Sequence, residues 1–184
     1  MQIYRILFIC SPMLLLLLVP GMQHVVWALP PGEPTVIMVE HYELPYPGIL
    51  PNHPLYPLKL VRDRMLDFLI RDPVKRINFY VLMADKRLNM GVYLTDEKEY
   101  VLAEETVSKG EKYLVRAIDA LYEATEAGRD LPPDMTDRIT VSSAKHQFVI
   151  TQIRDKSPEK VHAGYGASLS TAAENSKRIG EFGK

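Results

Sequence analysis

The sequence predicts an all-α protein: an antiparallel helical bundle of four to five helices, preceded by a proline-rich extended strap and an N-terminal signal or anchor helix. Apolar residues recur every three or four positions after residue 57, prolines are concentrated just before it, and an apolar run lies near the N-terminus. The 184 residues suffice for one ordinary domain. We divide the chain into a signal peptide or N-terminal membrane anchor at 1–28, a linker at 29–43, a helical domain with its N-terminal strap at 44–156, and a C-terminal helix at 157–184.

The N-terminal segment has the order of a secretory signal peptide. Arg5 precedes an apolar run at 6–19, and a short tract then ends in Val26, Trp27 and Ala28. Val26 and Ala28 fit the −3 and −1 positions of a cleavage site, which predicts cleavage before Leu29. The alternative is an uncleaved anchor, because a membrane-spanning helix needs about 20 largely apolar residues. Both interpretations place the rest of the chain outside the cytoplasm, either secreted or anchored to the membrane.

Charge and cysteine content narrow the classes of partner. Beyond residue 28 the chain has 21 Lys and Arg against 23 Asp and Glu, and its only cysteine is Cys10. A nearly neutral chain has no long-range field to attract nucleic acid or an anionic membrane. We therefore expect no nucleic-acid partner, and membrane contact only through the N-terminal segment if it is uncleaved. A cysteine-free domain forms no disulfide and relies on packing.

The segment at 29–57 predicts an extended strap, because proline fixes φ and removes a hydrogen-bond donor. Residues 36–39 are predicted to form one short strand. We expect Leu50, Leu55 and Tyr56 to dock in the groove between helices. The prolines of this segment are residues 30, 31, 34, 45, 47, 51, 54 and 57.

Helical periodicity then defines the bundle. A first helix is predicted at 58–69 and a second from Pro73, where Asp72 supplies a helix-start signal, to about residue 95. A third is predicted at 96–127, where large and small residues alternate along one seam and allow a neighbouring helix to approach closely. A fourth is predicted at 134–156.

The fifth helix, after Pro158, has a weaker signal. Its apolar residues fall at helical spacing, but three glycines interrupt it, and each costs about 1 kcal/mol relative to alanine in a helix interior. We therefore expect this helix to be frayed or mobile. Its glycines are Gly164, Gly166 and Gly180.

Two patterns were weighed as catalytic or phosphate-binding sites. Ser142 and Lys145 have the Ser-x-x-Lys spacing in which a lysine activates a serine nucleophile, but the accompanying motifs of such acyl-transfer sites are absent. A solvated helix face is the favoured interpretation. The glycine-rich stretch at 164–168 follows no strand and is not predicted to cradle phosphate.

A metal site and a methionine-rich surface are the remaining alternatives. Glu40, His41, Glu43 and His53 are residue types that metals accept, whereas His146 lies on an apolar helix face and is predicted to be a satisfied core histidine. Met83 and Met90, the methionines of the second helix, are predicted to fill the core. Neither residue set predicts catalytic, cofactor-binding or metal-binding residues, and we expect no enzyme activity and no cofactor.

The strap carries a resemblance. The run Pro-Gly-Ile-Leu-Pro-x-x-Pro-Leu-Tyr-x-Leu-Lys at 47–59, with Asp63-Arg64, Asp72-Pro73 and the stretches at 84–88 and 103–111, resembles a family of uncharacterised exported proteins, a domain of unknown function. Members place this motif just outside a signal or membrane segment. The resemblance covers 44–121 and implies no activity, so it supplies no catalytic residue.

These observations favour an exported or cell-envelope-associated helical domain that serves as a non-enzymatic interaction or structural module, in contact with an unidentified protein or envelope partner. The alternative is an extracytoplasmic sensor or holdase-like protein that binds metal or unfolded clients. An acyl-transfer enzyme that uses Ser142 and Lys145 is a third possibility.

Overall fold

The computed structural model of this protein describes residue 39 and residues 41–182, and these residues form an all-α fold without a strand. The predicted fold class is confirmed. The signal or anchor segment lies outside the described residues, and so does the expected strand except for Val39, which is helical. No helix in the described part is long and apolar enough to cross a membrane. The helices are α2 (Tyr56–Leu69), α3 (Pro73–Asp96), α4 (Tyr100–Glu126), α5 (Met135–Asp155), the 3-10 turn η1 (Glu159–Val161) and α6 (His162–Glu181).

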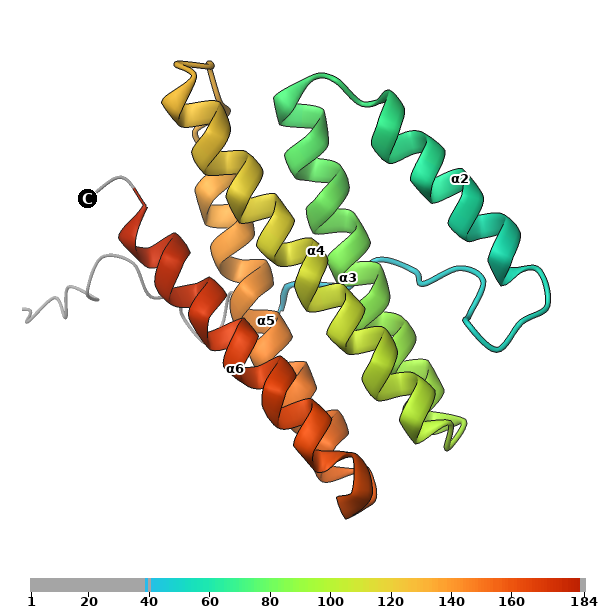
Figure 1. The fold of residues 1–184 in the computed structure, drawn as a ribbon. Coiled ribbons are helices and arrows are strands. Elements are labelled where there is room, and N and C mark those ends of the chain that lie inside the picture. Colours follow the sequence, from blue (N-terminus) through green and yellow to red (C-terminus); the bar gives the residue numbers. More distant parts are fainter. Residues whose placement is uncertain (1–38, 40, 183–184) are drawn as a thin grey trace, which may run out of the picture. The chain divides into compact units, whose positions relative to one another are not determined.

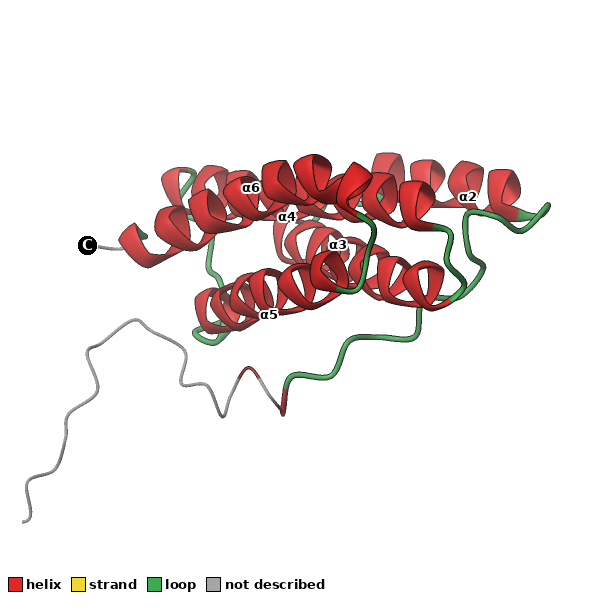
Figure 2. Ribbon diagram, turned by 90° about the horizontal axis from the view of Figure 1, so that it is seen from below, coloured by secondary structure: helices red, strands yellow, loops and turns green. Residues whose placement is uncertain are grey.

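Four of these helices form the body of the bundle. Helix α3 packs on α4, α4 on α6, α6 on α5 and α5 on α3, in two layers, with α2 along the outer side (Figures 1 and 2). One core cluster surrounds Ile77, Leu114 and Ile139, and a second surrounds Leu88 and Tyr165. Residues 31–184 form one compact unit that contains both clusters. The bundle can therefore be studied without the first thirty residues.

The predicted seam of alternating large and small residues joins α4 to α3. Ala103, Val107 and Leu114 are buried along it. A Cβ added at Gly110 would lie 3.2 Å from the carbonyl oxygen of Ala84, so the two backbones approach too closely there for a larger residue to fit without a shift. The seam prediction is confirmed.

Most helix boundaries agree with the predicted ones, and α4 is the exception. Helix α3 begins at Pro73, where the Asp72 carboxylate accepts a hydrogen bond from the Lys75 amide at 2.8 Å. Helix α4 begins at Tyr100 and not at residue 96, because the chain turns through a left-handed conformation at Lys98, with φ of 65°. The turn separates α3 from α4 and was not visible in the apolar pattern.

The C-terminal helix differs from its expected frayed state. Helix α6 is continuous, and it buries Tyr165, Ala172 and Ile179 against α4 and α5. The glycine cost is small beside the burial of a tyrosine and an isoleucine, each of which contributes about 1.5 to 3 kcal/mol. A Cβ at Gly164 would meet the Glu104 side chain at 2.3 Å, so this glycine allows the start of α6 to approach α4.

The strap lies on the helices through polar contacts. The Asn89 side chain of α3 donates to the Pro45 carbonyl at 2.9 Å, and Lys145 of α5 donates to the Val39 carbonyl at 3.0 Å. The expected docking in a helix groove is wrong for Leu55, which is 54% exposed, whereas Leu50 and Tyr56 are half-buried. Carbonyls turned toward helix side chains hold the extended chain, and Leu44 packs against the second core cluster.

Candidate functional site

Helix α2 presents its apolar side to solvent and its polar side to the bundle. An apolar stripe on an amphipathic helix normally faces the core. Here Lys59 is 9% exposed and Asp63 is 3% exposed, whereas Phe68 is 79% exposed and Leu58 is 69% exposed. We call the outward side of this helix the α2 stripe. It consists of Leu58, Val61, Met65, Phe68 and Leu69, all exposed.

Lys59 explains why α2 is oriented in this way. Its ammonium donates to the carbonyls of Pro47 at 3.2 Å and Ile49 at 3.3 Å, and it lies over the Tyr56 ring. Burial lowers its pKa to about 8, and the nearby Asp63 carboxylate opposes this change only in part. An inward lysine that satisfies two strap carbonyls keeps the opposite side of α2 outward.

An apolar groove runs between the strap and α2. Its volume is about 510 Å³. The strap supplies Ile49 and Leu55, and Lys59 and Arg62 also line the groove. The Lys59 ammonium is bonded to strap carbonyls, so the groove itself is apolar. The residues that α2 adds to its apolar wall are Leu58, Val61, Met65, Leu66 and Leu69.

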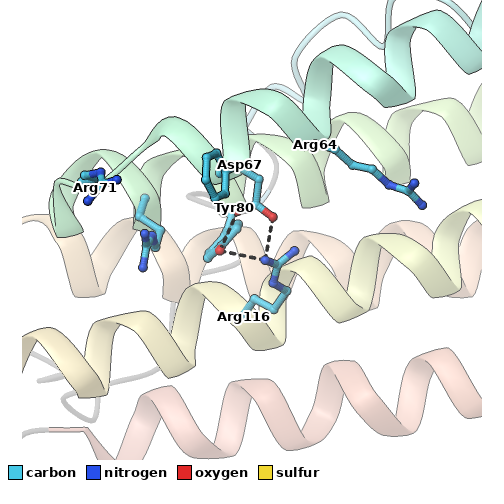
Figure 3. A pocket seen from close by; sticks show the side chains of 7 residues that line it. Arg64, Asp67, Arg71, Tyr80 and Arg116 are labelled. Atoms are coloured by element: carbon cyan, nitrogen blue, oxygen red, sulfur yellow. Dashed lines mark hydrogen bonds and ion pairs between the residues drawn. The ribbon is translucent and has the colours of Figure 1, made fainter.

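The other side of α2 carries a second cavity, which we call the arginine pocket (Figure 3). Its volume is about 530 Å³. Arg116 reaches from α4 toward α2 and donates to the Asp67 carboxylate at 2.7 Å and to the Tyr80 hydroxyl oxygen at 2.8 Å. The Tyr80 hydroxyl in turn donates to Asp67 at 2.8 Å. The pocket is lined by Arg64, Asp67, Phe68, Arg71, Arg76, Tyr80 and Arg116.

Charge is unevenly shared in this pocket. Four arginines and one aspartate are among the described residues that line it. Arg76 donates to the Ile70 carbonyl at 2.7 Å, and its buried Nε has no hydrogen-bond partner. Arg64 and Arg71 extend into solvent. Guanidinium groups match carboxylate and phosphate oxygens in pairs, so the pocket suits an anionic group.

A buried polar network lies inside the bundle, away from α2. His146 of α5 is fully buried and contacts the Glu111 carboxylate at 2.5 Å and the Asp85 carboxylate at 3.1 Å. Asp85 also accepts from Ser142 at 2.7 Å and from the strap residue Tyr42 at 2.6 Å. Burial opposes the imidazolium charge, but the two carboxylates outweigh it and raise the pKa of His146. Its predicted place as a satisfied core histidine is confirmed.

The Ser-x-x-Lys pair does not form a unit. We expected Ser142 on a solvated face, and this is wrong: Ser142 and Ser143 are fully buried, because they lie on the side of α5 that faces α3 and α4. Ser142 donates to Asp85, whereas Lys145 donates to the Val39 carbonyl. The predicted core positions of Met83 and Met90 are confirmed.

The described metal-ligand candidates do not form a metal site. His41 and Glu43 are on the surface, and the His53 ring accepts a hydrogen bond from the Leu55 amide at 3.1 Å. Glu40 is outside the described residues. Within the described part of the chain, no three His, Cys, Asp or Glu side chains are grouped to hold a metal ion. The glycine-rich stretch at 164–168 is part of α6.

Two of the stretches singled out in the sequence meet in this structure. Asp85 of the stretch at 84–88 and Glu111 of the stretch at 103–111 both contact His146, whereas Lys59, which ends the strap motif, contacts the Pro47 and Ile49 carbonyls. Residues 48–160 match the domain-of-unknown-function family DUF5667, which is more than half of the chain. The chain belongs to this family. No curated protein and no solved structure matches it.

The DUF5667 segment extends farther than the sequence resemblance, which we expected to end at residue 121. It includes α5. Ser142 and His146 of this helix form the buried polar network with Asp85 and Glu111. Helix α6 lies beyond the matched residues and still packs on them.

The apolar side of α2 follows from the sequence, but sequence reasoning missed its outward orientation and the arginine pocket. One signal was present: Lys59, Asp63 and Asp67 recur every four residues and place a polar stripe opposite the apolar one. Because the helix has one polar and one apolar stripe, this spacing does not decide which of them faces the bundle. The pocket had no such signal, because Arg76 and Arg116 come from other helices.

Proposed function

We propose that this DUF5667 protein is an exported, cell-envelope-associated interaction module without enzymatic activity, and that the α2 stripe is its contact surface. The observation that carries the proposal is the outward apolar side of α2. A contiguous exposed apolar surface is typical of an interaction site, whereas scattered apolar residues are ordinary. Nine of the thirteen exposed large hydrophobic side chains of the described residues lie between Tyr46 and Leu69.

The rest of the proposal rests on the sequence and on burial. The N-terminal order of Arg5, an apolar run and small residues supports export, with the domain either secreted or anchored. Ser142 and His146, which are the side-chain types of nucleophiles and bases, are fully buried and bonded to carboxylates. A contact function needs neither group at the surface.

Site-specific crosslinking tests the contact surface. Because Cys10 is the only cysteine of the chain, a Cys10→Ser background allows one reactive position at a time. A photo-crosslinker on Phe68→Cys should capture envelope components in cells that produce the full chain. The matched control is Phe148→Cys, at an isolated exposed phenylalanine of α5. Equal capture from both positions, or none from Phe68, contradicts the proposal.

The same groove also suits the alternative function of a holdase for unfolded clients. Its apolar wall is formed by side chains such as Leu58 and Met65, which an extended apolar segment can contact. A holdase should suppress the aggregation of a denatured reporter protein, and Met65→Asn should abolish this effect. Light scattering that is unchanged by the wild-type protein would dismiss this alternative.

A further inference from the structure

The arrangement of charge around α2 identifies the kind of surface that it contacts. We propose that the α2 stripe lies on an anionic lipid bilayer, with its apolar side chains below the headgroups and a lipid phosphate in the arginine pocket. This inference rests on the proposed function, since it takes the α2 stripe as the contact surface. It adds that the contacted surface is a lipid bilayer.

The acidic residues of α2 are turned away from the outward side. Asp63 is buried, and its Oδ1 accepts from the Arg62 guanidinium at 2.7 Å. Asp67 is bonded to Arg116 and Tyr80 in the arginine pocket. The exposed charged side chains of α2 are therefore Arg62 and Arg64, and both are basic. The outward side of the helix complements a negative surface.

The two arginines flank the stripe. At 3.6 residues per turn, Arg62 and Arg64 fall on opposite sides of the line through Val61 and Met65. Amphipathic helices that lie in the membrane interface combine an apolar side with basic flanks, and they bind through both buried apolar area and attraction to anionic lipids. Arginine stems can cross the apolar boundary and keep the guanidinium at the phosphates.

The arginine pocket adjoins the stripe through a shared residue. Phe68 belongs to the stripe and also lines the pocket. A lipid whose acyl chains contact Phe68 would have its phosphate within reach of the exposed Arg64 or of the exposed Arg71, which lie at opposite ends of the pocket (Figure 3). A single guanidinium can bind a phosphate in a bidentate manner. Neither the apolar stripe nor the pocket alone specifies a lipid, but their adjacency does.

A second copy of this chain fits the same surface less well. Two stripes packed face to face would bring Arg62 and Arg64 of both copies together without an exposed α2 carboxylate to offset them, and like charges disfavour such an interface. The whole-chain charge led us to expect no membrane contact here. That expectation used the net charge of the whole chain, whereas the basic residues around α2 are concentrated in one part of the surface.

Vesicle flotation of residues 31–184, the compact unit without the N-terminal segment, tests the proposal. Binding to an equal mixture of phosphatidylglycerol and phosphatidylcholine should be at least about tenfold tighter than binding to phosphatidylcholine alone. Arg62→Gln with Arg64→Gln should weaken it roughly 30-fold, at about fivefold for each arginine. Phe68→Asn should weaken it roughly tenfold, because one large apolar side chain no longer inserts.

The controls remove equal charge and equal apolar surface elsewhere. Lys156→Gln with Lys160→Gln changes two exposed lysines beyond α5, and Phe148→Asn changes the exposed phenylalanine of α5. Both should leave vesicle binding within about twofold of the wild type. Arg64→Gln, Phe68→Asn and the control variants should melt like the wild type, since the changed side chains are exposed. Arg62→Gln removes the hydrogen bonds to the buried Asp63 carboxylate and should lower the melting temperature, so vesicle binding is also measured for Arg64→Gln alone.

The outcomes separate the two proposals. Loss of binding from the lysine control, or equal binding to both vesicle types, overturns the lipid assignment. Absence of vesicle binding with continued crosslinking from Phe68→Cys to a protein shows that the occupant is an acidic protein segment and leaves the contact surface intact. Absence of both overturns the lipid assignment and the proposed function together.

In the full chain, a polarity-sensitive fluorophore at Phe68→Cys in the Cys10→Ser background reports the position of the stripe. Its emission should shift to the blue on anionic vesicles and should be quenched by lipid-borne quenchers. The same fluorophore at Phe148→Cys should show neither change. Equal quenching at both positions would overturn the proposed orientation.

Discussion

Helices α2 and α6 lie at opposite edges of the bundle in Figure 1 and direct their apolar side chains in opposite directions. Helix α6 turns Tyr165 and Ile179 into the cores, whereas α2 turns Phe68 and Leu58 to solvent. Both helices are amphipathic. The difference teaches that an apolar side alone does not determine which side of a helix faces the bundle. In α2 the inward side is the polar one, because buried Lys59 bonds the strap carbonyls, and the apolar side is left for an outside partner.

The largest expected effect comes from equivalent truncations on the two helices. Tyr165→Ala removes a fully buried ring and should lower the free energy of unfolding by about 3 to 5 kcal/mol. Phe68→Ala removes an exposed ring and should change it by less than about 0.5 kcal/mol. Urea denaturation measures both. Similar losses for the two variants would mean that the α2 stripe is packed within the protein.

A smaller effect concerns the charge that the bundle holds inside. The pKa of His146 is raised from 6.5 to about 10, so the charged imidazolium contributes stability fully below pH 6.5 and loses it as pH rises toward 10. The lowered pKa of Lys59, about 8, acts in the opposite direction above that pH. The clean window is therefore between pH 6.5 and 8.

Within this window, wild-type stability should fall by up to about 2 kcal/mol, which corresponds to several degrees in the melting temperature. His146→Gln should be less stable and should lack this slope, because it has no proton to lose. Melting curves at fixed ionic strength measure both. A wild-type melting temperature that rises with pH in this window would contradict the assignment of a charged His146.

The smallest expected effect tests the contact that orients α2. Lys59→Ala leaves the Pro47 and Ile49 carbonyls without this donor and should cost about 1 to 2 kcal/mol, since the lost hydrogen bonds are partly offset by removal of a buried charge. Amide exchange should accelerate in α2 more than in α6. Lys59→Met, which keeps the volume, should show the same local acceleration; a uniform change across the helices would count against a local tie.

The sequence was sufficient to predict the parts of the fold that follow from residue spacing within one helix. The alternation around Ala103 and Val107 predicted a close seam with a neighbouring helix, Asp72 predicted the start of α3, and the apolar setting of His146 predicted its burial. In each case the neighbours along the same helix carry the information. Local spacing is then an adequate guide to packing.

The buried polar network and the orientation of α2 could not be predicted from spacing along the chain. Tyr42, Asp85, Glu111 and His146 come from the strap and three helices, so no spacing in the sequence joins them. The expectation that α6 is frayed took account of its glycines but not of the burial of Tyr165. The orientation of α2 depends on carbonyls of the strap, which no side-chain pattern records.

The polar contacts of the strap also define how the domain would respond to force. If the N-terminal segment stays in a membrane, a pull from it enters the domain at Val39 and first loads the hydrogen bond from Lys145. The contacts at Tyr42, Pro45 and Pro47 follow along the strap, so tension would break them one after another before it reached α2. Under tension the strap would thus detach in steps while the helices behind it remain folded.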